Sequence, residues 1–302
     1  SLNANLVGIC NLFFGILTMR ISIIIPAHNE AVFLKECLDS FIGQSYLPNE
    51  LIVVDDNSSD DTFAIAQGYA QKHPWIKAVQ RKSTDEHIPG KKVVDTFNFG
   101  LEHASEHDLV GKFDADIVLP LDYFENMVNQ FQANWKLGMC SGLLFVQTGD
   151  EWVYEDIANK NHIRGPIKLY HKACFHKIGG LPSGVGWDTV DILLAQYHGF
   201  DTLTLPELKV KHLRPTGHGY SAKNYQSKGV AIQNEVWART DQNCSPKNGL
   251  AGQKSRFIHS SPLGFFEGSS PAAGEICFQK RGQIHQNISL ERNLVQNPII
   301  TL

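Results

Sequence analysis

Asp114 and Asp116 stand one residue apart at the end of an apolar segment in this chain of 302 residues. Apolar side chains flank the pair, with Phe113 before it and Ile117 after it, as in a buried strand. A buried carboxylate is costly unless its charge is compensated, and a divalent cation compensates it by taking oxygen ligands. The pattern therefore indicates either a metal site or a strand end whose acids turn into solvent.

Two further polar clusters favour a ligand or metal site over the purely structural interpretation. Glu30 comes shortly after the apolar residues 21–25, and Asp55 and Asp56 directly follow the apolar residues 51–54. Both segments are rich in β-branched residues, which is typical of buried parallel strands. Ligands of a doubly wound sheet bind beyond the carboxyl ends of such strands. Three polar clusters at one edge therefore predict a binding site there.

The elements that must position these acids alternate between strand and helix. We predict strands at residues 21–25, 51–54, 76–79 and 108–113, and helices after Glu30, from about 60 to 72 and at 93–103. This alternation predicts an α/β fold with a doubly wound, mostly parallel sheet. The first strand is not followed by a G-x-G-x-x-G motif, which argues against a dinucleotide-binding oxidoreductase.

Helix faces and caps can also be predicted locally. We expect Ser58 or Ser59 to cap the second helix. The apolar positions of the first helix are expected to form its buried face, namely Val32, Leu34, Cys37, Leu38, Phe41 and Ile42.

From about residue 134 the pattern changes to a smaller region of mixed strand direction. Expected strands are 139–146, 167–170, 203–205 and 210–213, with a short helix at 171–178 and a longer one at 188–199. From residue 231 onward Ser, Gly, Asn, Gln and Pro become frequent, which predicts an irregular tail over 231–302. A shifted reading frame there would encode basic and aromatic residues, so a frameshift near residue 231 is a hypothesis.

Charge and cysteine usage limit the class of protein. A net charge of −4 and an isoelectric point near 6.3 give no basic excess for binding nucleic acid. The six cysteines are scattered without the spacing of a zinc or redox motif, which predicts free thiols in a reducing cytosol. The apolar run 12–17 is too short to span a bilayer. We expect a cytoplasmic protein that starts at Met19, with residues 1–18 as a non-native or disordered leader.

Five segments, taken together and in order, resemble the family 2 glycosyltransferases. They are IIIPAHNE, LIVVDDNSSDDT, KFDADIVLP, KLYHKACFHKIGGL and GWDTVDILLAQYHGF. The resemblance implies a Rossmann-like GT-A fold over residues 19–230. It also implies an inverting transfer of a sugar from a UDP- or GDP-sugar to a hydroxyl group, with Mn²⁺ or Mg²⁺ as cofactor. The resemblance further implies a glycan or lipid-linked acceptor. It also implies peripheral association with the inner face of the membrane and a role in cell-envelope polysaccharide synthesis.

The resemblance implies roles for the residues at the strand ends. Asp116 and Asp114 would ligate the metal, and His212 would be a third ligand, a phosphate contact or a structural histidine. Lys91 or Lys92 would replace the family's usual basic residue near the phosphates, with a solvated loop cation as the structural alternative. The expected nucleotide-sugar contacts are Pro26, Ala27, Glu30, Asp55, Asp56, Lys92 and Asp114, with helix capping as the alternative for Asp55.

The last of the five segments would supply the general base. By its spacing Asp188 matches the family's aspartate, with Asp191 as the alternative base and helix capping as the structural alternative for Asp188. Trp187 replaces the usual acidic neighbour and would lie on the acceptor side, stacked on a sugar or packed in the core. A nucleotidyltransferase and a non-catalytic sugar-nucleotide binding module remain competing functions.

Overall fold

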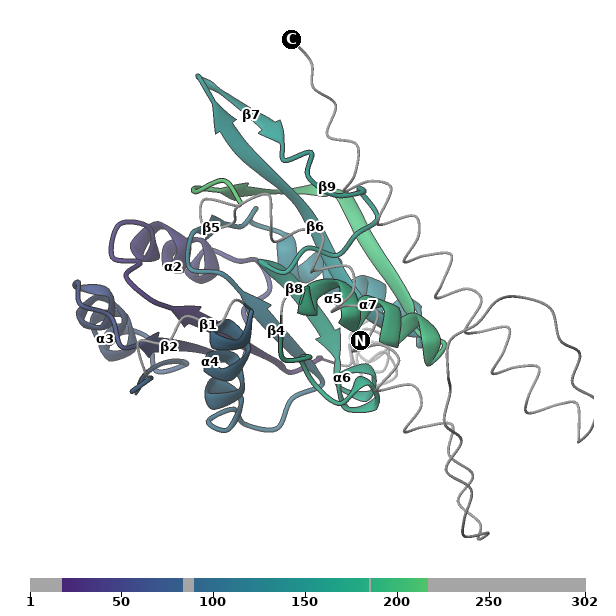
Figure 1. Ribbon diagram of the computed structural model, residues 1–302, viewed down its shortest axis with the longest axis horizontal. Helices are drawn as coiled ribbons and strands as arrows, with labels where there is room; N and C mark the ends of the chain where they lie inside the picture. The colour runs from purple at the N-terminus through teal and green to yellow at the C-terminus, as the bar shows by residue number, and fades with distance from the viewer. Residues whose placement is uncertain (1–17, 84–89, 185, 217–302) are drawn as a thin grey trace, which may run out of the picture.

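The computed structural model describes residues 18–83, 90–184 and 186–216 (Figure 1). The expected leader up to residue 17, the expected tail over 231–302 and the section 217–230 of the expected transferase domain lie outside the described residues.

The first half of the sheet is parallel, as predicted. Its strands are β1 (Ile21–Ala27), β2 (Glu50–Asp56), β3 (Ile76–Arg81) and β4 (Leu109–Phe113), in the spatial order β3-β2-β1-β4. Helices α2 (Leu34–Ile42), α3 (Thr62–Lys72) and α4 (Lys91–Leu101) lie between consecutive strands in the chain. The carboxyl ends of all four strands therefore meet at one edge of the sheet, where the predicted acids stand.

The second half of the sheet is mixed in direction. It contains β5 (Ile117–Val118), β6 (Leu137–Thr148), β7 (Glu151–Tyr154), β8 (Ile167–His171) and β9 (Asp201–His212). The order continues from β4 as β8-β6-β9-β5, with β7 paired to the outer end of β6. Because β5 follows β4 closely in the chain but ends the spatial order, the sheet curls into a half-barrel (Figure 1).

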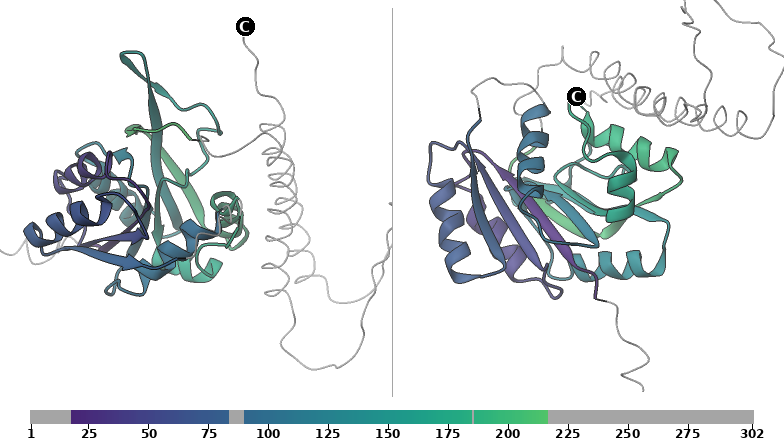
Figure 2. Two further views of the ribbon diagram at one scale, coloured as in Figure 1. Left: turned by 60° about the vertical axis from the view of Figure 1, so that its left-hand side comes forward. Right: turned by 90° about the horizontal axis from the view of Figure 1, so that it is seen from below.

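Helices cover both faces of the sheet (Figure 2). The remaining helices are α5 (Tyr123–Ala133), α6 (Lys172–Ile178) and α7 (Trp187–Tyr197). Side chains alternate along β1, so that Ile23 packs in a core layer with α2, α3 and α5, and Ile24 packs in a layer with α4, α6 and α7. Each layer is closed on one side by helices, which confirms the predicted doubly wound arrangement.

Two local predictions were wrong. Val32 is 83% exposed because α2 begins only at Leu34, so Val32 belongs to the preceding turn and not to the buried helix face. The N-cap residue of α3 is Asp61, which makes no capping hydrogen bond with its side chain, and Oδ1 of the preceding Asp60 accepts a hydrogen bond from the Thr62 backbone N–H at 3.0 Å. Ser58 instead accepts a hydrogen bond from the backbone N–H of Asn29, which ties the turn after β1 to the turn after β2.

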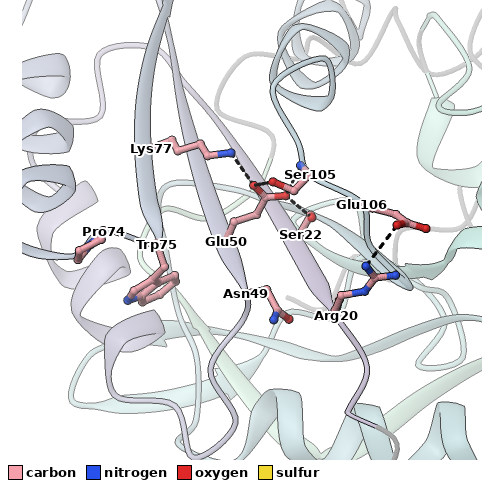
Figure 3. Close-up of a pocket in the computed structure, with 9 residues that line it drawn as sticks. All are labelled: Arg20, Ser22, Asn49, Glu50, Pro74, Trp75, Lys77, Ser105 and Glu106. Atoms are coloured by element: carbon pink, nitrogen blue, oxygen red, sulfur yellow. Dashed lines mark hydrogen bonds and ion pairs between the residues drawn. The ribbon is translucent and has the colours of Figure 1, made fainter.

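At the opposite edge of the parallel strands a cavity of about 460 Å³ opens beside Trp75 (Figure 3). Its buried carboxylate, Glu50, accepts hydrogen bonds from Ser22 Oγ at 2.5 Å and Lys77 Nζ at 2.7 Å. The Ser105 backbone N–H donates a further one at 2.6 Å. Burial opposes ionisation, but these donors lower the pKa of Glu50 overall. Glu50 is therefore satisfied by the protein itself and ties the starts of three strands together.

Candidate functional site

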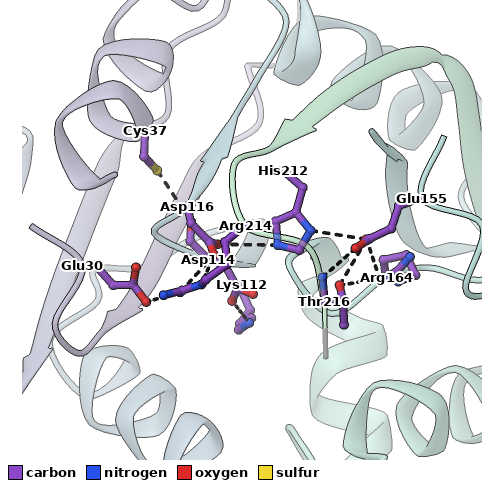
Figure 4. Close-up of polar contacts among 10 residues, drawn as sticks. All are labelled: Glu30, Cys37, Lys112, Asp114, Asp116, Glu155, Arg164, His212, Arg214 and Thr216. Atoms are coloured by element: carbon purple, nitrogen blue, oxygen red, sulfur yellow. Dashed lines mark hydrogen bonds and ion pairs between the residues drawn. The ribbon is translucent and has the colours of Figure 1, made fainter. Parts of the chain in front are cut away.

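Asp116 lies buried just beyond the carboxyl end of β4 (Figure 4). Its Oδ2 atom accepts a hydrogen bond from Arg214 Nε at 3.1 Å and forms an ion pair with Arg214 Nη2 at 3.0 Å, and its Oδ1 atom lies 3.7 Å from His212 Nε2. Pairing of β5 with β9 and a backbone hydrogen bond from Leu213 N to Asp116 O, 2.8 Å long, fix this arrangement. Burial and the charge of Asp114 raise the pKa of Asp116, against the lowering effect of His212 and Arg214.

Asp114 faces the same space but is more accessible. Lys112 Nζ donates a hydrogen bond to its Oδ1 atom, and about a third of its side chain remains exposed. Its backbone N–H donates to Pro166 O at 2.9 Å. The thiol of Cys37 lies beneath the pair and donates to Asp114 O at 3.6 Å. The two acids therefore differ: Asp116 is enclosed and Asp114 faces outward.

Arg214 joins Asp116 to Glu30. Its Nη2 atom also donates to Glu30 Oε1, and its guanidinium group lies over the Phe33 ring, 5.5 Å from the ring centroid. The second oxygen of Glu30, Oε2, is buried and has no hydrogen-bond partner within the described part of the chain. Burial raises the pKa of Glu30 and the hydrogen bond from Arg214 opposes that shift. Sequence reasoning missed Arg214, although a cation directly after a strand end was a visible signal.

His212 is held from its other side by Glu155, which was also missed. Glu155 Oε2 lies 3.3 Å from His212 Nδ1 and accepts a hydrogen bond from Arg164 Nη2 at 2.9 Å. The backbone N–H of Thr216 donates to Oε1 at 2.7 Å. Although burial opposes ionisation, the hydrogen bonds from His212 and Thr216 and the charge of Arg164 lower the pKa of Glu155 to about 2. Glu155 therefore fixes the His212 ring so that its Nε2 atom faces Asp116.

Asp55 and Asp56 end β2 as predicted, and both are buried. Asp55 Oδ2 accepts a hydrogen bond from Gln80 Nε2 at 3.2 Å, whereas its buried Oδ1 atom has no hydrogen-bond partner among residues 18–83, 90–184 and 186–216. Asp56 Oδ1 pairs with Arg81 at 3.0 Å, and Oδ2 lies 3.8 Å from Lys92 Nζ. The expected nucleoside contacts Pro26 and Ala27 lie in register beside Val54 and Asp55.

The two candidate lysines of α4 are in different environments. Lys92 approaches Asp56, whereas Lys91 forms an ion pair of 2.5 Å with Asp95 one helical turn further on. Of the two, Lys92 is therefore the one that lies at the carboxyl edge of β2.

Helix α7 brings Asp188 toward Asp114 through the turn at residues 164–166. A Cβ atom placed on Gly165 would lie 3.3 Å from Asp188 Cβ and 3.4 Å from Asp188 Oδ2. The next residue, Pro166, accepts the hydrogen bond from the Asp114 backbone N–H. Arg164, on the other side of Gly165, bonds to Glu155. Three consecutive residues thus contact Glu155, the partner of His212, and the segments that carry Asp188 and Asp114.

Trp187 is largely buried beside this turn. The ammonium groups of Lys112 and Lys168 lie 5.3 Å and 5.4 Å from its ring centroid. Packing in the core, which was the alternative to stacking on a sugar, therefore covers most of the Trp187 surface.

Asp191, the alternative base, is completely buried. Lys168 Nζ donates to its Oδ1 and Oδ2 atoms at 2.7 and 2.9 Å, and the Tyr170 hydroxyl donates to Oδ2 at 2.6 Å. Lys168 also donates to the Asp188 backbone oxygen at 2.6 Å. The contacts favour a structural role for Asp191, because its oxygens are already hydrogen-bonded and no solvent reaches it.

The donor set at Asp116 fits a divalent cation that also binds phosphate. The described residues contain no group of three or more His, Cys, Asp or Glu side chains placed to hold a metal. Mg²⁺, however, is usually held by one or two carboxylates together with substrate phosphates. Asp116 and His212 offer an oxygen and a nitrogen that face each other without a direct hydrogen bond, and Asp114 stands beside them.

The described helices include none that is both long and apolar enough to cross a membrane.

A family model described as "Glycosyl transferase family 2" matches residues 22–181. Among curated proteins, the probable glycosyltransferase YdaM of Bacillus subtilis (strain 168) is 35% identical over 99 residues, which cover 32% of this chain and 23% of that protein. The poly-beta-1,6-N-acetyl-D-glucosamine synthase of Staphylococcus epidermidis is 30% identical over 153 residues, covering 51% of this chain and 32% of that protein. The chain therefore spans less than a third of the length of these relatives.

Solved structures share the fold at low sequence identity. The mannosyltransferase PcManGT from Pyrobaculum calidifontis, in complex with GDP-Man and Mn²⁺, superposes with a TM-score of 0.56 at 16% identity, covering 93% of this chain and 74% of that one. Residues 1–349 of S. aureus TarS, in complex with UDP-GlcNAc, give a TM-score of 0.57 at 19% identity, covering 74% and 70%. These matches confirm the predicted GT-A fold.

Proposed function

Because the chain belongs to glycosyl transferase family 2, we propose that it moves a sugar from a nucleoside-diphosphate donor to an acceptor hydroxyl group with inversion at the anomeric carbon. Membership of this family supports a glycosyltransferase activity, and the solved structures of similar fold support a nucleotide-sugar donor. The inversion, the metal and the roles of individual residues are our proposal. The transferase domain would extend over residues 19–230.

The observation that carries this proposal is the turn at residues 164–166. Its Pro166 oxygen is bonded to Asp114, and its Gly165 packs against Asp188. The acid proposed for the donor side and the acid proposed for the acceptor side come from distant parts of the chain, and both lie next to this one short turn. Their closeness supports single-step inversion, in which the base approaches the sugar from the face opposite the leaving group.

The nucleoside would bind along the ends of β1 and β2. The buried Oδ1 atom of Asp55, which no described residue hydrogen-bonds, is an acceptor for an N–H group of the base. Pro26, Ala27 and Glu30 would line the nucleoside, with Asp56 and Lys92 nearby. The similar structures bind UDP-GlcNAc and GDP-Man, which supports a nucleotide-sugar donor but leaves both bases open.

Asp116 and His212, assisted by Asp114, would hold Mn²⁺ or Mg²⁺ together with the donor diphosphate. When bound, the cation stabilises the negative charge that develops on the leaving diphosphate. Glu155 keeps the His212 ring oriented, and the Lys112 ammonium stays beside Asp114. Two similar structures, those of PcManGT and of GalNAc-T7, contain Mn²⁺, which supports this choice of cofactor.

Asp188 would accept the proton of the acceptor hydroxyl as that oxygen attacks. An α-linked donor then gives a β-linked product without a covalent intermediate. Trp187 would form the wall on the acceptor side. One relative is named as a polysaccharide synthase, which supports a glycan or lipid-linked acceptor in cell-envelope synthesis. A cytoplasmic enzyme at the inner face of the membrane would meet such an acceptor.

The substitution Asp188→Asn tests this function. We expect kcat to fall by about 10²–10⁴-fold, as for a lost general base, while the affinity for the nucleotide is unchanged. Asp191→Asn is unsuitable as a control because Asp191 is structural, so exposed Asp122→Asn serves instead. NMR coupling constants of the product report its anomeric configuration. A product with the donor's configuration, or full activity of Asp188→Asn, would contradict the proposal.

A further inference from the structure

We propose that Arg214 exchanges partners during the reaction cycle. In the nucleotide-free protein it neutralises Asp116 and Glu30, and when a divalent cation and the donor bind it transfers to the donor diphosphate. The inference rests on the proposed function, because it assumes that Asp116 is a metal ligand. It assigns a diphosphate-binding role to a residue that the sequence motifs did not identify.

Exposure places Arg214 on the outer side of the acids that it neutralises. Its side chain is 43% exposed, whereas the side chains of Asp116 and Glu30 are 6% and 13% exposed. A ligand that approaches the acids from solvent would therefore meet the guanidinium group first. The group also lies over the Phe33 ring, a contact that does not tie any of its N–H donors to a partner.

The ion pair between Arg214 and Asp116 cannot keep its full strength when a divalent cation binds to Asp116. Arg214 contributes one hydrogen bond and one further ion-pair contact to one oxygen of Asp116, and His212 faces the other. A divalent cation at Asp116 would stand beside the guanidinium group, and the two positive charges would repel each other. Arg214 would then need another anion within reach.

The donor diphosphate is that anion. A guanidinium group presents its N–H donors in a planar fork that matches phosphate oxygens, and it remains charged at any working pH. Arg214 Nη1 has no hydrogen-bond partner in the described ranges, so one donor edge is available before any exchange. Glu30, once released, could accept a hydrogen bond from a hydroxyl group of the donor.

The exchange predicts effects of opposite sign for one substitution. Arg214→Gln removes a competitor of the cation, so the nucleotide-free variant should bind Mn²⁺ about two- to fivefold more tightly, the range expected for a partly exposed ion pair. The same variant should bind UDP or GDP in the presence of Mn²⁺ about tenfold or more weakly, because it loses a charged hydrogen bond to phosphate.

Electron paramagnetic resonance of free Mn²⁺ measures the first affinity and isothermal titration calorimetry the second. Arg20→Gln is the matched control: Arg20 also pairs with two acids and its side chain is 44% exposed, but it lies at the opposite edge of the sheet. It should change neither affinity. Arg214→Lys keeps the charge but loses the fork, so its diphosphate affinity should fall between those of the wild type and Arg214→Gln.

Asp116→Asn separates failure of this inference from failure of the proposed function. If Asp116→Asn abolishes Mn²⁺ binding but Arg214→Gln leaves it unchanged or weaker, the exchange is refuted and the metal site stands. If Mn²⁺ binds equally well to Asp116→Asn, the proposed metal site and the exchange are both refuted. Tighter Mn²⁺ and weaker diphosphate binding in Arg214→Gln would support the exchange.

Discussion

In the parallel half of the sheet, Glu30 and Asp55 each keep one buried oxygen that no described residue hydrogen-bonds. In the mixed half, every carboxylate oxygen of Glu155 and Asp191 accepts at least one hydrogen bond. A buried polar atom without a partner is costly and rare in native proteins. The cost is accepted where a ligand brings the missing donors, so the vacant oxygens mark the side on which a nucleotide would bind.

Glu50 shows that a carboxylate oxygen without a partner depends on the edge of the sheet at which the acid lies. It does not depend on whether the acid belongs to the parallel or the mixed half. Glu50 belongs to the parallel half, yet protein donors bond both of its oxygens. It stands at the start of β2, whereas Asp55 stands near the end of the same strand. Vacant carboxylate oxygens therefore coincide with the carboxyl edge, where the substrate of such a sheet is expected.

The largest loss of stability should come from a substitution in the buried cluster around Asp191, whose carboxylate oxygens all accept hydrogen bonds. Lys168→Met would leave Asp191 charged, buried and without its cation, and should lower the free energy of unfolding by about 3–5 kcal/mol. Urea denaturation measures the loss. The double variant Lys168→Met/Asp191→Leu should recover most of it, because apolar residues tolerate the buried site. A loss below about 1 kcal/mol would show that Asp191 is not held as tightly as its contacts indicate.

Glu155 should give the next largest effect, through pH. Its pKa is lowered from 4.5 to about 2 in the folded protein, so its charged form contributes stability above pH 4.5 that is lost as the pH falls toward 2. In metal-free buffer, Glu155→Gln should remove roughly 2–3 kcal/mol of this dependence. Unfolding free energies from pH 7 to pH 2 test it. Parallel curves for variant and wild type would mean that Glu155 is not selectively stabilised as a charge.

A smaller loss is expected from Tyr170→Phe. This change removes one hydrogen bond to Asp191 Oδ2, which keeps its bond to Lys168. The free energy of unfolding should fall by about 1.5 kcal/mol. Tyr46→Phe removes a hydroxyl bonded to a backbone oxygen near the surface and serves as a milder comparison. Equal losses in the two variants would argue against a special contribution of the buried cluster.

The smallest effect should have the opposite sign. Burial raises the pKa of Glu30, so its charged form costs stability at neutral pH and this cost disappears as the pH falls below 4.5. Glu30→Gln should therefore raise the free energy of unfolding at pH 7, by less than about 1 kcal/mol because Arg214 loses a partner. The gain should vanish near pH 4. A loss at pH 7 similar to that of Glu155→Gln would remove the distinction between vacant and satisfied acids.

Local sequence patterns predicted most of the helices and strands. β-branched runs marked the parallel strands. Gly179 and Gly186, both with φ near 80°, bound the end of α6 and the start of α7. Helix α5 was overlooked although Phe124, Met127, Val128 and Phe131 repeat at helical spacing. Two strands were expected where β9 is one, because Pro206 and Glu207 interrupt its apolar pattern while pairing with β6 continues across an irregularity.

The carboxyl edge was predicted only in part. The acids that directly end β2 and β4 could be found because each follows an apolar run. The partners of Arg214 and Glu155 could not be assigned, because they depend on pairing between strands far apart in the chain, β5 with β9 and β6 with β9. Pairing of β5 with β9 brings Arg214 to Asp116, and no local pattern encodes that choice.

The position of β9 also has a consequence for how the chain acquires its shape during synthesis. β9 is the last described strand in the chain, yet it lies between β6 and β5 rather than at an outer edge. When a nascent chain has emerged only as far as α7, the position between β6 and β5 is still empty. The backbone groups of β6 and β5 that face this position are then unpaired. We expect β5 and β9 amides to gain protection from hydrogen exchange last, in pulse-labelled refolding. Until β9 pairs with β6 and β5, the incomplete chain can pair with other copies of itself. This is the species that chaperones would need to bind.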